Sequence, residues 1–165
     1  MLTNDQFDSN LPNAVLAFVR TTIGIFCWKA IKICMAHSQD SIEELRKHRL
    51  KYVFSMFFVQ KIIWADEIAE PEELAYVQEH FPTSVLQALD LTDPQTFPPL
   101  LEEALTILPT ELSEEEKLQV IGLCFGAAAS TGTVNPGEVA ILQVAAEKLN
   151  ISNDLLFEYI QELLY

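Results

Sequence analysis

The sequence has few of the residues that interrupt helices. It contains only five glycines among 165 residues, and its eight prolines fall mostly between apolar runs. Half of the residues are apolar, and they recur mainly at the i, i+3, i+4 spacing of a helix with one buried face. A chain of this length can bury one sizeable core. We therefore predict an all-helical fold, a bundle of about seven helices forming a single domain over residues 1–165.

Motifs of enzyme chemistry are missing as well. The sequence contains neither a glycine-rich phosphate-binding loop nor an HExxH metal motif. The three histidines, His37, His48 and His80, stand at helix ends or in a basic run, where surface or capping roles outweigh catalytic ones. A nucleophile placed beside a base is not recognisable. We predict that the chain is not an enzyme and has no catalytic or cofactor-binding residues.

Cysteine is scarce and unpatterned. Cys27, Cys34 and Cys124 are odd in number, lie inside apolar runs and lack CxxC spacing. Cys27 and Cys34 are seven residues apart, which on a helix is about 10 Å along the axis and beyond the reach of a disulfide. We expect buried, reduced thiols and a cytoplasmic protein, with neither a secretory signal nor a transmembrane segment.

Lysine and arginine are nearly absent from the later part of the chain. Residues 1–61 carry eight of them against five acidic residues, a net charge of +3, whereas residues 62–165 carry two against nineteen, a net charge of −17. We expect no nucleic-acid partner, because phosphates would meet a repelling field over most of the surface. The acidic surface either keeps the protein soluble or complements a cation or a protein partner with a basic surface.

Periodicity and capping signals predict where the helices lie. An apolar N-terminal helix over residues 12–37 and a C-terminal helix over residues 152–164 are expected to pack on a core of about residues 45–150. The N-terminal helix is apolar and carries three basic residues. It could pack in the core, form an interface with another molecule or lie on a membrane surface. The helices of the core are predicted at residues 40–64, 71–81, 84–91, 97–108, 113–130 and 136–149.

The helices predicted at residues 40–64 and 113–130 are expected to form the central pair. The first holds an apolar segment that is hydrophobic on all sides, as in a helix surrounded by others. The second carries Gly122 and Gly126 four residues apart, a spacing that allows a neighbouring helix to approach closely. We predict that the aromatic run Phe54, Phe57 and Phe58 fills the groove beside these glycines.

Two stretches of the sequence repeat the same helix-loop-helix corner. The first elbow covers residues 64–74 and the second elbow residues 130–140, and their matching residues are 65 positions apart. Around the end of each, a proline, a glutamate and an alanine recur at equal spacing: Pro71, Glu73 and Ala75 against Pro136, Glu138 and Ala140. We infer that one domain contains two related halves.

The first elbow is crowded with carboxylates. Asp66, Glu67, Glu70, Glu72 and Glu73 fall within eight residues, and they repel one another unless a cation lies among them. Hard cations such as calcium take six to eight oxygen ligands, so Asp66 and Glu73 could approach one ion from two sides. The spacing is not that of an EF-hand loop. The alternative is that the dipole of the following helix stabilises these acids by roughly 0.3 to 1 kcal/mol each.

The two elbows resemble the TerB-like, tellurite-resistance-associated family, which includes a domain of certain DnaJ-like membrane proteins. The family pattern is Ala-Asp-Gly, a few residues, Pro-Glu-Glu and a second helix, occurring twice in an all-helical domain. The matching segments, within about residues 45–150, are Ala65-Asp66-Glu67 with Pro71-Glu72-Glu73, and Ser130-Thr131-Gly132 with Asn135-Pro136-Gly137-Glu138. The resemblance implies a cytoplasmic bacterial bundle without established catalysis, tied to metal and tellurite stress, whose acidic corner residues bind metal.

The sequence departs from that family pattern in both elbows. Glu67 stands in place of the usual glycine, which puts the turn geometry in question, and Thr131 replaces the aspartate, which removes a carboxylate. The hypothesis is a non-catalytic TerB-like module that binds a divalent cation such as calcium; the alternative is an acidic protein–protein interaction scaffold without metal. The predicted ligands are Asp66 and Glu73, with Glu67 and Glu70 as helpers and Glu138 as a weaker candidate.

Overall fold

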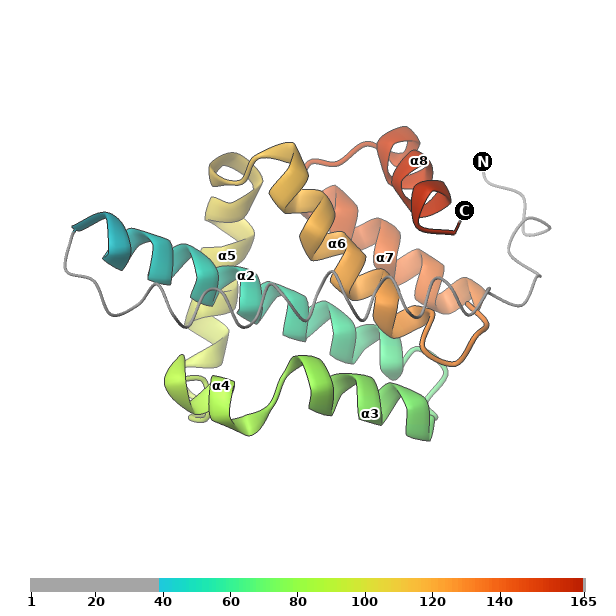
Figure 1. Ribbon diagram of the computed structural model, residues 1–165, viewed down its shortest axis with the longest axis horizontal. Helices are drawn as coiled ribbons and strands as arrows, with labels where there is room; N and C mark the ends of the chain where they lie inside the picture. The colour runs from blue at the N-terminus through green and yellow to red at the C-terminus, as the bar shows by residue number, and fades with distance from the viewer. Residues whose placement is uncertain (1–38, 165) are drawn as a thin grey trace.

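The computed structural model describes residues 39–164, and the regular structure in this part is helical throughout (Figure 1). This confirms the predicted all-helical bundle, while the helix predicted at residues 12–37 lies outside the described residues. Within the described part, none of the helices has the length and apolar character needed to cross a membrane. The helices are α2 (Gln39–Ile63), α3 (Pro71–His80), α4 (Thr83–Ala88), α5 (Phe97–Glu111), α6 (Glu114–Ala128), α7 (Pro136–Lys148) and α8 (Asn153–Leu164).

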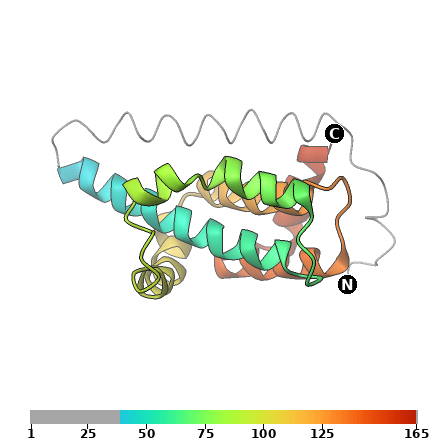
Figure 2. The ribbon, with the colours of Figure 1, turned by 90° about the horizontal axis from the view of Figure 1, so that it is seen from below.

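Helix α2 is the centre of the bundle. It packs against α5, α6 and α7, and Figure 1 shows α5 crossing it steeply, so that Figure 2 views α5 nearly end-on. Four consecutive residues of α2, from Tyr52 to Ser55, are buried. A helix with one apolar face cannot bury four residues in a row, so α2 must be enclosed on several sides. This confirms the prediction of a surrounded helix.

The basic residues in the first half of α2 pair with acidic residues of the same chain. Glu116 of α6 accepts from both Lys47 and Lys51. Burial alone would raise the pKa of Glu116, but the backbone N–H of Ser113 and the two lysines lower it to about 2. The remaining pairs are more exposed and contribute less. They join Arg46 to Glu43 and Glu103, and Arg49 to Asp90.

Capping side chains set several helix boundaries where the sequence placed them. Ser113 and Glu116 form a reciprocal capping box at the start of α6, and Ser152 accepts a hydrogen bond from the first turn of α8. Helix α5 differs, because it continues through Pro109 to Glu111 instead of closing before the proline. A proline removes one backbone donor, which is tolerated when only a last partial turn follows.

Gly122 of α6 meets a different neighbour from the one predicted. A Cβ atom added at Gly122 would lie 2.6 Å from Oη of Tyr159, so a side chain of α8 occupies the space beside this glycine. The rings of Phe54, Phe57 and Phe58 pack on one another instead, with centroids 4.7 and 5.1 Å apart. At Gly122 the prediction was wrong because α8 packs against α6, and the spacing of the glycines could not reveal this neighbour.

The two elbows have matching backbones. Pro71 is the first residue of α3 and Pro136 the first of α7. The left-handed region is occupied at equivalent positions, by Glu67 with φ 67° and by Gly132 with φ 85°. Glu67 therefore keeps the turn that a glycine makes in the second elbow. The likeness does not extend to equal halves, because α2 has 25 residues and α6 has 15.

We predict that Glu67→Gly stabilises the protein by up to about 1 kcal/mol, because a side chain in the left-handed region costs roughly 1–2 kcal/mol and glycine avoids this cost. The matched change Gly132→Ala should destabilise by about 1 kcal/mol, since open space surrounds the new Cβ and only the backbone is strained. Urea denaturation at constant pH measures both. Equal stability of both variants and the parent chain would contradict this account of the turns.

Candidate functional site

The two elbows lie at the same end of the bundle, as both views show (Figures 1 and 2). Helix α7 packs against α2, and a Cβ atom at Gly137 would lie 3.6 Å from Cβ and 3.8 Å from the carbonyl oxygen of Ala65. The first turn of α7 therefore rests on the first elbow. We call the combined surface of the two elbows the two-elbow end.

Each elbow buries one glutamate. Glu73 is 3% exposed and Glu138 is 4% exposed, although both stand in the first turn of a helix. Oε2 of Glu73 accepts a 2.7 Å hydrogen bond from the backbone N–H of Glu70, and Oε2 of Glu138 accepts one of the same length from Asn135. These are the capping contacts of a glutamate at the third helical position. The sequence repeat thus holds two carboxylates in equivalent ways.

The buried glutamates and Asp66 act on one another electrostatically. Burial raises the pKa of Glu138 to about 7; the hydrogen bond from Asn135 opposes this rise, and the charges of Glu73 and Asp66 add to it. Burial also raises the pKa of Glu73, and the negative charges of Asp66, Glu70 and Glu72 raise it further. Such effects require short separations or a low local dielectric. We therefore treat Asp66, Glu73 and Glu138 as one group, the elbow carboxylates.

The five predicted ligands have different surroundings. Asp66 is exposed, and its Oδ1 accepts from the backbone N–H of Ile68 at 3.1 Å, which closes the turn. Glu67 and Glu70 are exposed; Glu67 occupies the left-handed turn position, and Glu70 precedes α3, where its charge raises the pKa of Glu73. The charges of Asp66 and Glu73 act on Glu138, and the contact of Gly137 with Ala65 places the first turn of α7 against the first elbow. Glu138 is therefore more central than the sequence suggested, and its place in the repeated capping box was the available signal.

The elbow carboxylates are not arranged as a finished metal centre. Within residues 39–164, no group of three His, Cys, Asp or Glu side chains is positioned to hold a metal ion. Glu73 and Glu138 each use one oxygen to cap a helix, which leaves the second oxygen of each outside that contact. A divalent cation takes several oxygen ligands at 2.0–2.6 Å. The carboxylates would have to turn toward one point to bind it.

A cysteine and a histidine also lie in the core. Cys124 is buried and free, and burial raises the pKa of its thiol to about 12, so it is the inert, reduced cysteine that the sequence predicts. His80, predicted to have a surface or capping role, is instead 6% exposed and packs on Tyr76 with ring centroids 4.1 Å apart. Burial lowers the pKa of His80, which keeps it neutral at pH 7.

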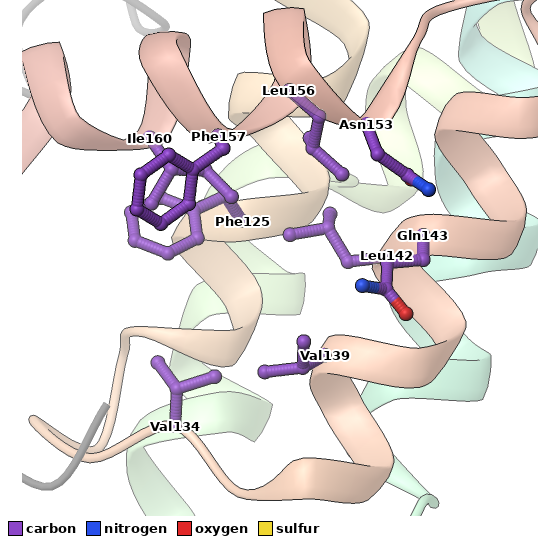
Figure 3. A pocket seen from close by; sticks show the side chains of 9 residues that line it. All are labelled: Phe125, Val134, Val139, Leu142, Gln143, Asn153, Leu156, Phe157 and Ile160. Atoms are coloured by element: carbon purple, nitrogen blue, oxygen red, sulfur yellow. The ribbon is translucent and has the colours of Figure 1, made fainter. Parts of the chain in front are cut away.

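A small apolar hollow lies where α8 covers the second elbow (Figure 3). Val134 and Val139 of the second elbow face Leu156 and Ile160 of α8 across it, and the amides of Gln143 and Asn153 lie at one side. The remaining lining residues are Phe125, Leu142 and Phe157. Helix α8 therefore covers apolar side chains of the second elbow.

The first elbow leaves apolar side chains exposed. Trp64 is 58% exposed, Ile68 is 63% exposed and Leu74 is 46% exposed. The sequence pattern did not single these residues out, because Trp64 continues the apolar period of α2 and Leu74 reads as the buried face of α3. The available signal was their interleaving with acids, which is unusual for a core segment.

We predict that Glu138→Gln stabilises the protein at pH 8 by about 2 kcal/mol relative to the parent chain in the presence of a chelator. The folded pKa of about 7 lies above the unfolded value of 4.5, so the folded state loses stability as pH rises through this window. Glutamine keeps an oxygen for the capping bond, and the advantage should vanish near pH 4.5. Urea denaturation from pH 4.5 to 8.5 measures the difference.

The exposed Glu147 of α7 provides the control for this prediction. Glu147→Gln should leave the dependence of stability on pH close to that of the parent chain, because this side chain is exposed and does not contribute to the raised pKa of either buried glutamate. A constant difference between Glu138→Gln and the parent chain at every pH would contradict the raised pKa.

Comparisons of the chain with protein-family models, with curated proteins and with solved structures find no match.

Proposed function

We propose that the chain is a non-catalytic, TerB-like helical module that takes up a divalent cation at the two-elbow end. The observation that carries the proposal is the burial of Glu73 and Glu138 at the starts of α3 and α7, which the contact of Gly137 with Ala65 places at one end of the bundle beside Asp66. Two of these side chains are almost fully buried, where an uncompensated negative charge is costly. A cation among them would remove that cost.

The surroundings of the elbow carboxylates favour a cation over a basic side chain. Within residues 39–164, the ion pairs that reach beyond one helix join the first half of α2 to α5, α6 and the loop after α4, away from the elbows. The chain has no Lys or Arg between Lys61 and Lys117. Calcium tolerates irregular coordination by oxygen atoms. Three carboxylates could supply part of its coordination sphere, and backbone carbonyls and water could supply the rest.

Cation binding in this proposal is coupled to the loss of a proton. Glu138 is largely protonated below pH 7, and a carboxylic acid must give up its proton before it can coordinate a metal ion. The affinity for the cation should therefore rise as pH increases from 6 to 8. The burial of Glu138 then serves both states: the protonated carboxyl group stabilises the module without a cation, and the ionised carboxylate binds the cation.

The biological setting rests on the resemblance of the two elbows to the TerB-like family. Under this proposal the module works in the cytoplasm of a bacterial cell, in the response to metals or tellurite. Under this proposal the cation is a structural or regulatory ligand. Its role would be to hold the two elbows together.

We predict that millimolar calcium raises the melting temperature at pH 8, because a ligand that binds only the folded state adds about 2.7 kcal/mol of stability at 100 times its Kd. Asp66→Asn combined with Glu73→Gln should abolish the rise, and Glu138→Gln should weaken it. Glu147→Gln, an exposed acid of α7, is the matched control and should respond like the parent chain. Differential scanning calorimetry measures the shift against sodium chloride of equal ionic strength.

Magnesium, manganese and zinc are titrated in the same way to identify the preferred ion. No shift with any of the four ions, or an equal shift in the double variant, would remove the cation from the proposal. A shift that is independent of pH between 6 and 8 would contradict the coupling to Glu138.

A further inference from the structure

We propose that the first elbow is also a docking surface for an amphipathic helix with a basic polar face, supplied by another protein. This surface shares the exposed Asp66 with the elbow carboxylates, whereas Glu73 and Glu138 are buried and do not belong to it. Its apolar part consists of Trp64, Ile68 and Leu74, and its acidic part of the exposed side chains around them.

Exposed apolar side chains are concentrated on this elbow. Of the large apolar residues that are exposed in the described part of the chain, half fall within the eleven residues of the first elbow; the others are Ile42, Leu45 and Val144. Trp64 is a side chain of the kind that dominates binding energy at protein interfaces. Apolar residues gathered on a surface and rimmed by charges typically mark a contact site.

The second elbow shows what covers such a surface. Val139 stands 65 positions after Leu74, and it is half-buried where it lines the hollow that Leu156 and Ile160 of α8 close from the other side (Figure 3). Leu74, at the equivalent place on α3, is 46% exposed. Helix α8 packs on α6 and α7, so a partner helix would pack in the equivalent way on α2 and α3. Laying an amphipathic helix on apolar anchors is a common mode of peptide recognition.

The negative charge of the first elbow requires positive charge on the partner helix. Asp66, Glu67, Glu70 and Glu72 are exposed beside the apolar anchors. The basic residues in the first half of α2 are engaged with other acidic side chains of this chain. A partner helix therefore needs Lys or Arg on its polar face. The α8 helix of a second copy would be repelled, since it carries three acidic residues and no Lys or Arg: Asp154, Glu158 and Glu162.

The test uses the full chain and a synthetic helical peptide of leucine and lysine, fluorescently labelled, in buffer with a chelator. Binding measured by anisotropy should weaken as salt rises, because the rim contacts are electrostatic. Trp64→Gln, Ile68→Gln and Leu74→Gln should each weaken binding about tenfold or more, as expected for anchor residues. Val144→Gln, which removes an equally exposed apolar side chain from α7, should leave binding unchanged.

Three results would overturn the proposal. The first is equal binding by the elbow variants and Val144→Gln, or by a leucine and glutamate peptide with the same apolar face. The second is a dimeric chain that Trp64→Gln converts to monomer, which would identify a second copy as the occupant. The third is tighter peptide binding after Arg20, Lys29 and Lys32 are replaced by glutamine, which would identify the chain's own N-terminal residues as the occupant.

Discussion

The structure of the two-elbow end depends on two buried glutamates that cap neighbouring helices. Glu73 and Glu138 must each accept a backbone N–H to begin α3 and α7, so neither can leave without freeing a helix start. The packing of Gly137 on Ala65 brings these helix starts together. The capping requirement therefore brings two carboxylates into mutual repulsion, and a proton on Glu138 relieves it, as a cation would under the proposed function.

Charged residues have different surroundings at the two ends of α2. At its beginning, basic side chains pair with acids of α5, α6 and the loop after α4, so opposite charges stabilise the packing of distant segments. At its end, the first elbow carries acids, exposed apolar residues and a strained Glu67. Strain, unpaired charge and exposed apolar surface are features that proteins retain where binding takes place.

The sequence predicted where helices begin and end better than which helices pack against one another. Capping residues such as Ser113 and Asn135 fixed helix starts because their hydrogen bonds span only three residues. The helix end predicted before Pro109 was wrong because a proline in the last turn of a helix costs little stability. The nearness of Glu138 to the first elbow depends on how α7 packs on α2, which no spacing encodes. The exposure of Trp64 could not be read for the same reason, since its position fits the period of α2.

The central claim is that Glu73 and Glu138 form one electrostatic unit across the two elbows. The most direct test is a double-mutant cycle of Glu73→Gln and Glu138→Gln, with unfolding free energies measured at pH 8 in a chelator. Each single change removes the same repulsion, so the double variant should gain less than the two single gains combined, by on the order of 1 kcal/mol. Gains that add to within about 0.3 kcal/mol would show that the two carboxylates do not interact.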